Sequence, residues 1–251
     1  MKLLNYSATP VSQLLPTGAA APPRRYPRLL EMLPPQDREF LLDRAIERTL
    51  AKGQVPYHQG DESRNLFVLK SGIVKVHYTH DSGTSLTASH YREGMLIGAH
   101  GCSEWAGPHV WSAQALVESR AIWMRRADLL ELVDRSPAAL RCILAITEFK
   151  SVQLRKVIRI LATPLLESRI TMALEHLGSL YGIERDGEVE IDGRFTHQEL
   201  AEMVGCSRQS VTTALQSLER AGRLRRDGRQ FFIRRASSPD TQPQPLRVPA
   251  E

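Results

Sequence analysis

The sequence predicts an α+β fold made of a β-roll, a long helix, and two short helices followed by a hairpin. Three observations carry this prediction. Short β-rich runs, separated by glycine and Asp-Ser turns, lie between about residues 53 and 124. One long helical pattern follows them. After residue 195 come a helix, a glycine turn, a second helix and a basic hairpin pattern.

Length, composition and charge narrow the class of protein. The chain has 251 residues, 42% hydrophobic and 24% charged, which suits two modest globular domains. No apolar run approaches the ~20 residues of a membrane span. The opening MKLLNYSATP does not resemble a signal peptide, so we expect a cytoplasmic protein with no membrane partner. The net charge of +5 favours a nucleic-acid partner.

The three cysteines exclude two kinds of site. Cys102, Cys142 and Cys206 are odd in number and far apart, which argues against a disulfide framework. No CxxC pair is present, which argues against a four-cysteine iron–sulfur cluster. We predict no cofactor from the residues alone.

Composition shifts divide the chain into five segments. The predicted segments are a flexible arm over 1–25, a β-roll over 26–135, a long helix over 136–163, a domain of two short helices and a hairpin over 164–236, and a disordered tail over 237–251. Within the roll, LFVLKSGIVKVHY is interpreted as two strands about a Ser71-Gly72 turn.

The long helix has clear end signals and two apolar faces. Ser136 can cap it, Pro137 suits its first position, and Pro164 ends it. A 4-3 spacing, typical of a coiled-coil seam, predicts a homodimer through Leu140, Leu144, Thr147, Ser151, Leu154, Ile158 and Leu161. We expect the other face, with Cys142, Ile146, Phe149 and Ile160, to lie on the β-roll.

The two short helices are separated by a tight turn. Thr196 to Glu199 is a capping-box pattern, Gly205 suits a left-handed turn, and Ser207 can cap the second helix. In the second helix we expect a buried stripe of Val211, Ala214, Leu215 and Leu218. The hydrogen-bonding side chains expected on the opposite face or flanking it are Gln209, Thr212, Thr213, Gln216 and Ser217, with Arg208 at the first turn.

This arrangement predicts a winged helix-turn-helix that binds DNA. The candidate base-reading residues are Arg208, Gln209, Thr212, Thr213 and Gln216, because Arg binds guanine, Gln can bind adenine, and Ser and Thr contact bases or phosphates. A wing is expected to turn at Asp227-Gly228, and residues 196–236 hold eight Arg against four Asp and Glu. An ordinary solvated helical hairpin is the alternative, but such a face is usually richer in Glu and Lys.

The combination of roll, long helix and CSRQSVTTAL resembles the Crp/Fnr family of bacterial transcription regulators over residues 27–235. The resemblance implies a homodimer on a palindromic operator, a roll that senses a signal, and RNA polymerase as a further partner. It assigns base reading to Arg208, Gln209 and Thr213, of which Thr213 departs from the arginine of the best-known member. It assigns phosphate contacts to Thr196, His197, Gln198, Ser207, Ser210 and Arg229.

The resemblance also locates the positions that bind a cyclic nucleotide in this family, and the binding residues are replaced at these positions in this sequence. The ribose-binding Glu is replaced by Ala99, and the phosphate-binding Arg by Trp111, followed by Ser112. The Thr-Ser pair that touches adenine falls on Leu154 and Arg155. Since no arginine occurs from 93 to 119, we expect DNA binding that does not depend on cAMP.

Three alternatives remain for the roll. His100 and Cys102 are weak candidates for haem ligands, and another small-molecule effector or no effector at all is equally open. A cupin-like metalloenzyme is a remote alternative, because HYTH places its two histidines on opposite faces of a strand. Five other histidines are spread through the roll, and most of them are expected in turns or on strand surfaces: His58, His77, His80, His90 and His109.

Overall fold

The computed structural model describes residues 26–98, 107–185, 187–191, 195–228 and 230–234. The chain divides into two compact units, one ending at Ile158 and the other beginning at Arg159. Both predicted terminal segments, 1–25 and 237–251, lie outside the described residues, as do Ala99, His100, Cys102 and Arg229. No helix in the described residues is long and apolar enough to span a membrane.

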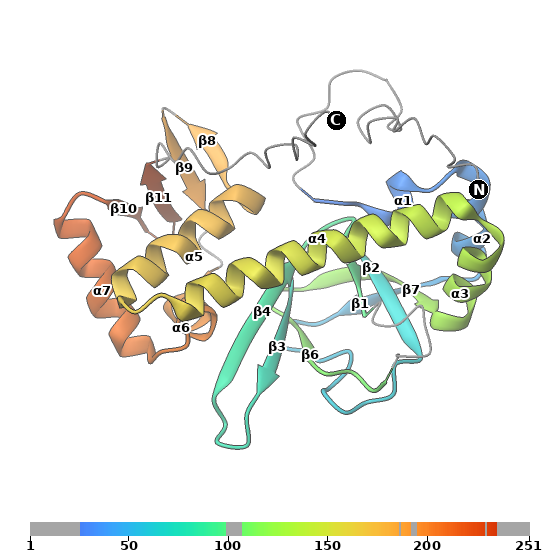
Figure 1. The fold of residues 1–251 in the computed structure, drawn as a ribbon, viewed down its shortest axis with the longest axis horizontal. Coiled ribbons are helices and arrows are strands. Elements are labelled where there is room, and N and C mark those ends of the chain that lie inside the picture. Colours follow the sequence, from blue (N-terminus) through green and yellow to red (C-terminus); the bar gives the residue numbers. More distant parts are fainter. Residues whose placement is uncertain (1–25, 99–106, 186, 192–194, 229, 235–251) are drawn as a thin grey trace, which may run out of the picture. The chain divides into compact units, whose positions relative to one another are not determined.

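The first unit is a β-roll flanked by short helices (Figure 1). Its strands form two sheets, in the orders β1-β7-β2-β5 and β4-β3-β6. The elements are α1 Leu29–Met32, α2 Pro35–Leu42, β1 Ile46–Leu50, β2 Asn65–Ser71, β3 Val74–Thr79, β4 Ser85–Tyr91, β5 Leu96–Ile97, β6 Ser112–Ala115, β7 Ser119–Arg125, α3 Arg126–Arg135 and most of α4 Pro137–Ala162. One apolar cluster joins side chains from both sheets, including Phe67 of β2 and Val74 of β3.

The turn between β2 and β3 crosses from one sheet to the other. Both predicted strands exist, but β2 pairs with β5 and β7 while β3 pairs with β4 and β6. Gly72 has a φ of 95°, and a Cβ built there would lie 2.1 Å from the Ser119 hydroxyl oxygen. No larger residue fits this crossover without a shift of β7.

Helix α4 is one continuous element, and the residues of its inner face pack against different partners along its length. Cys142 and Ile146 belong to the apolar cluster that joins α1, α2 and α3 to strands β2, β5 and β7, and Phe149 packs against the cluster between the sheets. The prediction that this face of the helix lies on the β-roll is therefore confirmed for these three residues. Ile160 is buried, but it belongs to the second compact unit rather than to the roll.

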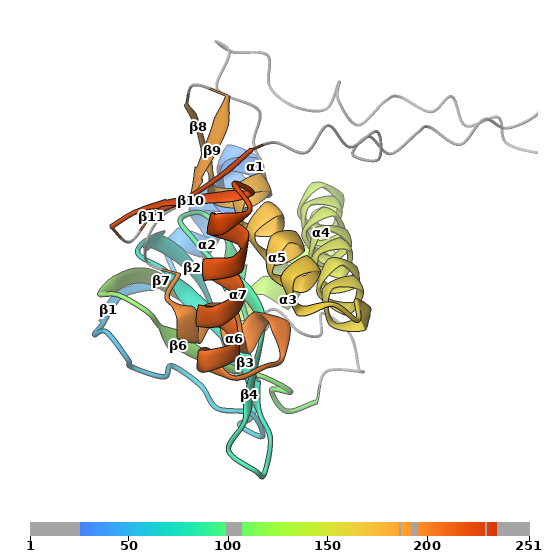
Figure 2. The same cartoon turned by 90° about the vertical axis from the view of Figure 1, so that its left-hand side faces the viewer.

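The second unit contains three helices and a four-stranded antiparallel sheet (Figure 2). Its elements are α5 Leu166–Tyr181, β8 Ile183–Arg185, β9 Glu188–Ile191, α6 His197–Val204, α7 Arg208–Arg220, β10 Leu224–Asp227 and β11 Gln230–Arg234. Strands β8 and β9 pair as a hairpin, and Gly187 between them has a φ of 80°. Strand β9 also pairs with β11, so that hairpin and wing share one sheet.

Candidate nucleic-acid interface

The helix-turn-helix is held by local caps that the sequence predicts correctly. The Thr196 hydroxyl accepts a hydrogen bond from the Glu199 backbone N–H at 3.2 Å and starts α6. Gly205 ends α6 in the left-handed region, with a φ of 65°. The Ser207 hydroxyl accepts from the Ser210 N–H at 3.0 Å and starts α7. Each cap satisfies a backbone group that the helix end leaves unpaired.

Helix α5 supports the end of α6 through one arginine. The Arg169 guanidinium donates a hydrogen bond to the Val204 carbonyl oxygen at 2.9 Å. A positive group at the carboxyl end of a helix interacts favourably with its dipole. The sequence gives no local signal for this contact, since the two residues are far apart in the chain.

Helix α7 has one buried apolar face and one exposed polar face, as the sequence predicts. Its inner stripe is buried in full: Val211, Ala214, Leu215 and Leu218. Its outer side chains Arg208, Gln209, Thr213 and Gln216 are exposed. The Thr213 hydroxyl donates to the Gln209 carbonyl at 3.2 Å, so that it keeps only a methyl group and acceptor lone pairs for another molecule.

The residues expected at phosphates surround the start of α6 and the start of α7. Thr196, Gln198 and Ser207 are exposed, whereas His197 and Ser210 are half-buried. The Gln198 amide donates to Glu202, and the Ser207 and Ser210 hydroxyls lie 2.8 Å apart. The sixth predicted residue, Arg229, lies outside the described residues.

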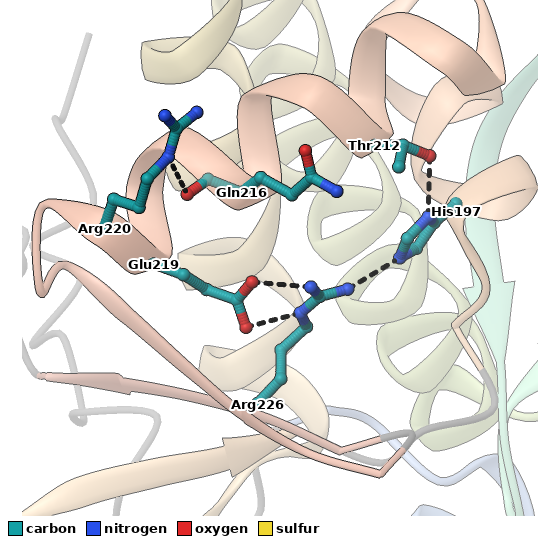
Figure 3. A network of polar contacts seen from close by, with 6 residues as sticks. All are labelled: His197, Thr212, Gln216, Glu219, Arg220 and Arg226. Carbon is teal, nitrogen blue, oxygen red and sulfur yellow. Dashed lines mark hydrogen bonds and ion pairs between the residues drawn. The ribbon is translucent and has the colours of Figure 1, made fainter.

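His197 belongs to a polar network that joins α6, α7 and the wing (Figure 3). Its Nδ1 lies 2.9 Å from the Thr212 hydroxyl oxygen, and its Nε2 lies 3.2 Å from Nη1 of Arg226. Arg226 in turn donates two hydrogen bonds to the Glu219 carboxylate, at 2.6 and 2.5 Å. Sequence reasoning missed Arg226 and Glu219, because nothing in the local pattern shows that β10 returns beside α7.

Two wing arginines are already paired within the domain. Arg225 donates to Glu188 at 2.6 Å and stacks on the Phe232 ring at 3.7 Å, while Arg226 pairs with Glu219. The arginine count of the sequence therefore overstates the positive charge available to phosphates. The exposed arginines on α7 and in the turn that follows it are Arg208, Arg220 and Arg223.

Among the described residues, those at the cyclic-nucleotide positions are either packed in the roll or exposed on α4. Trp111 is half-buried against the apolar cluster of the roll. The Ser112 hydroxyl is buried and accepts from the Gln59 backbone N–H at 2.9 Å. Leu154 and Arg155 are exposed on α4. Ala99 lies outside the described residues.

The histidines of the roll do not all lie at its surface. His58 and His80 are exposed and His77 is half-buried, as expected for most of these histidines, whereas His90 and His109 are buried. The next residue after His90, Tyr91, is buried as well, which means that both faces of β4 are covered there. His109 stacks on Tyr57 at 3.7 Å, and burial lowers its pKa. Within the described ranges, no group of three or more His, Cys, Asp or Glu could hold a metal ion.

The predicted seam of α4 is a stripe that the protomer leaves uncovered. Leu144 is 55% exposed and Ile158 is 64% exposed, although both are large and apolar. The other exposed members of the stripe are Leu140, Thr147, Ser151 and Leu154, and Leu161 is half-buried.

Comparisons with known proteins agree with this geometry. The family model for a cyclic nucleotide-binding domain matches residues 47–136, and that for a Crp-like helix-turn-helix domain matches residues 168–237. The cyclic AMP receptor protein of Thermus thermophilus is 25% identical over 202 residues, covering 78% of this chain and 88% of that protein.

Solved structures share the fold at lower identity. The c-di-GMP responsive regulator CLP of Xanthomonas campestris gives a TM-score of 0.67 at 21% identity, over 79% of this chain and 98% of that chain. FixK2 of Bradyrhizobium japonicum gives a TM-score of 0.66 at 18% identity, over 76% of this chain and 92% of that chain.

Proposed function

The chain belongs to the Crp/Fnr family of bacterial transcription regulators, and from this premise we propose that it acts as a homodimer on a palindromic operator without requiring cAMP. It is a sequence-specific DNA-binding regulator. The observation that carries the proposal is the outer face of α7, where exposed hydrogen-bonding side chains follow a capped turn. Such a helix can enter the major groove with its first residues against base edges.

Arg208 is the central base-reading residue in this proposal. Its side chain is exposed, and its guanidinium makes no hydrogen bond or ion pair in the described part of the chain. A guanidinium binds guanine O6 and N7 together. Gln209 stands where the best-known relative has a glutamate that accepts from cytosine, and an amide can bind adenine instead.

Thr213 is expected to relax recognition at one base pair of each half-site. Its hydroxyl proton is held by the Gln209 carbonyl, and the short side chain cannot span two guanine acceptors. Its methyl group can pack on a thymine methyl. Selection from a random duplex pool should therefore recover a guanine for Arg208 and little guanine preference opposite Thr213.

The variant Thr213→Arg should restore guanine preference at that pair by about 1–3 kcal/mol, the usual value of a bidentate contact. The substitution is at an exposed position of α7, so the fold has room for the longer side chain. Strong guanine selection opposite Thr213 in the unmodified protein would contradict the assignment. Failure to recover any sequence would contradict the proposed function.

The homodimer is supported by the uncovered stripe of α4. A stripe of this kind at 4-3 spacing is what a two-stranded coiled coil buries. Two copies related by a two-fold axis would present two α7 helices to half-sites one helical turn apart, about 10 bp.

Independence from cAMP is proposed because the residues do not fit its phosphate. No arginine occurs from 93 to 119, and Trp111 packs against an apolar cluster. A buried anion without a partner charge costs several kcal/mol. Isothermal titration of the full-length protein with cAMP and with cGMP should show no micromolar binding. Tight binding at one nucleotide per protomer would overturn this part of the proposal.

Two further roles follow from the family and are proposed with it. A promoter-bound member needs RNA polymerase as a partner, and a DNA-binding regulator works in the cytoplasm. A haem-sensing or other ligand-sensing regulator with the same DNA-binding mode is the second hypothesis for the roll. It has no support among the described residues, because His100 and Cys102 both lie outside them.

A further inference from the structure

The hydrogen-bond partners around His197 favour one of its two neutral tautomers. The Thr212 hydroxyl donates its single proton to the Arg208 carbonyl oxygen at 3.0 Å. The same hydroxyl oxygen lies 2.9 Å from Nδ1 of His197, so that Nδ1–H must be the donor in this contact. Nε2 faces Nη1 of Arg226 at 3.2 Å, and a guanidinium nitrogen can only donate. Nε2 is then the acceptor, and this set of contacts corresponds to the neutral Nδ1–H tautomer.

The charges around His197 favour the same neutral form. The pKa of His197 is lowered first by partial burial and then by the Arg226 and Arg208 guanidinium groups, while Glu219 acts in the opposite direction. Arg226 is itself fixed by its two hydrogen bonds to Glu219. A proton on Nε2 would point at a guanidinium that already donates toward it.

The network connects α6, α7 and β10, and the relative positions of these three elements define the DNA-binding surface. His197 begins α6, Thr212 and Glu219 lie on α7, and Arg226 lies on β10 of the wing. The Thr212 hydroxyl is occupied by the Arg208 carbonyl and by His197, which leaves it one lone pair. Figure 3 shows that Arg226 lies between the Glu219 carboxylate and the His197 ring.

We propose that His197 is a positioning residue, a neutral strut that holds the recognition helix α7 to the wing through Arg226, and not a cationic contact to phosphate. Thr212 then supports this strut and does not read a base. The proposal rests on the proposed function, because it concerns how the same DNA-reading surface is assembled. It reverses the expectation that His197 serves as a phosphate contact.

Two substitutions distinguish a neutral strut from a phosphate contact, because the two roles predict opposite orders of affinity. Gln has a neutral amide that can donate to Thr212 and accept from Arg226, whereas Arg is the better phosphate ligand but would face Arg226. On a duplex selected from a random pool, we expect H197Q to bind at least about tenfold more tightly than H197R. An H197R protein that binds as tightly as H197Q, or more tightly with a steeper salt dependence, would overturn the proposal.

The same comparison in an R226A background provides the control for misfolding. Without the Arg226 charge, H197R should recover most of its deficit relative to H197Q, because the repulsion is gone. An H197R/R226A protein that melts like the R226A protein but does not recover operator binding would count against the strut. Thermal melting of each variant shows whether the fold is intact.

The tautomer can be measured without DNA, which separates this inference from the proposed function. The protein has eight histidines, and loss of one signal in H197Q assigns His197 in a ¹⁵N-histidine NMR spectrum. At pH 7.5 the strut predicts a neutral ring protonated at Nδ1. A cationic ring, or a ring protonated at Nε2, would overturn the proposal even if operator binding is confirmed.

Discussion

Replacing Leu144 and Ile158 by aspartate is expected to convert the protein to a monomer and to weaken operator binding by at least about 100-fold. Both side chains are more than half exposed in the protomer, so the substitutions should leave the fold of each unit intact. In the dimer each aspartate would face its own copy across an apolar seam, where burial and like charge both oppose association. Light scattering measures the mass, and fluorescence anisotropy measures the affinity.

A matched control tests whether the seam itself is responsible. Val152 is 40% exposed on α4 and lies next to seam residue Ser151, but outside the 4-3 stripe. Val152→Asp should therefore stay dimeric and bind the operator. If Leu144→Asp/Ile158→Asp remains dimeric, or if the control dissociates to the same degree, then α4 does not pair along this stripe. A monomeric wild-type protein on its operator would exclude the homodimer altogether.

Replacing Arg208 by alanine is expected to cost about 1–3 kcal/mol per half-site at one guanine. In a dimer with two half-sites the cost is about 2–6 kcal/mol, or roughly 30-fold to 10⁴-fold in affinity, if the two sites are independent. The loss should be confined to operators that carry the guanine, because only the guanidinium fork discriminates it. Binding curves on duplexes that differ at this pair alone measure the effect.

The informative comparison is Arg229→Ala, which removes the same side chain from the predicted wing turn. A phosphate contact carries no sequence information, so this change should weaken all duplexes alike and reduce the salt slope by about one unit per half-site, or about two units for the dimer. Arg208→Ala should instead flatten the preference among sequences. Uniform weakening by Arg208→Ala would show that Arg208 contacts the backbone and that the base-reading assignment is wrong.

The helix-turn-helix could be predicted from the sequence because its signals are local. Thr196, Gly205 and Ser207 each act on backbone groups within about one helical turn, and the structure confirms all three. The α7 stripe and the exposed seam of α4 also follow from spacing along a single helix, since periodicity alone decides which side chains share a face.

Features that depend on contacts between residues distant in sequence could be seen only in the tertiary structure. The strands about Gly72 enter different sheets, and His90 and His109 are buried, because pairing and burial are decided by residues distant in sequence. Arg225 and Arg226 add positive charge in the sequence but find carboxylates on β9 and α7 in the fold. The resemblance of the sequence led us to expect His197 at the DNA-binding surface, but only the tertiary structure shows that Arg226 of β10 contacts its ring.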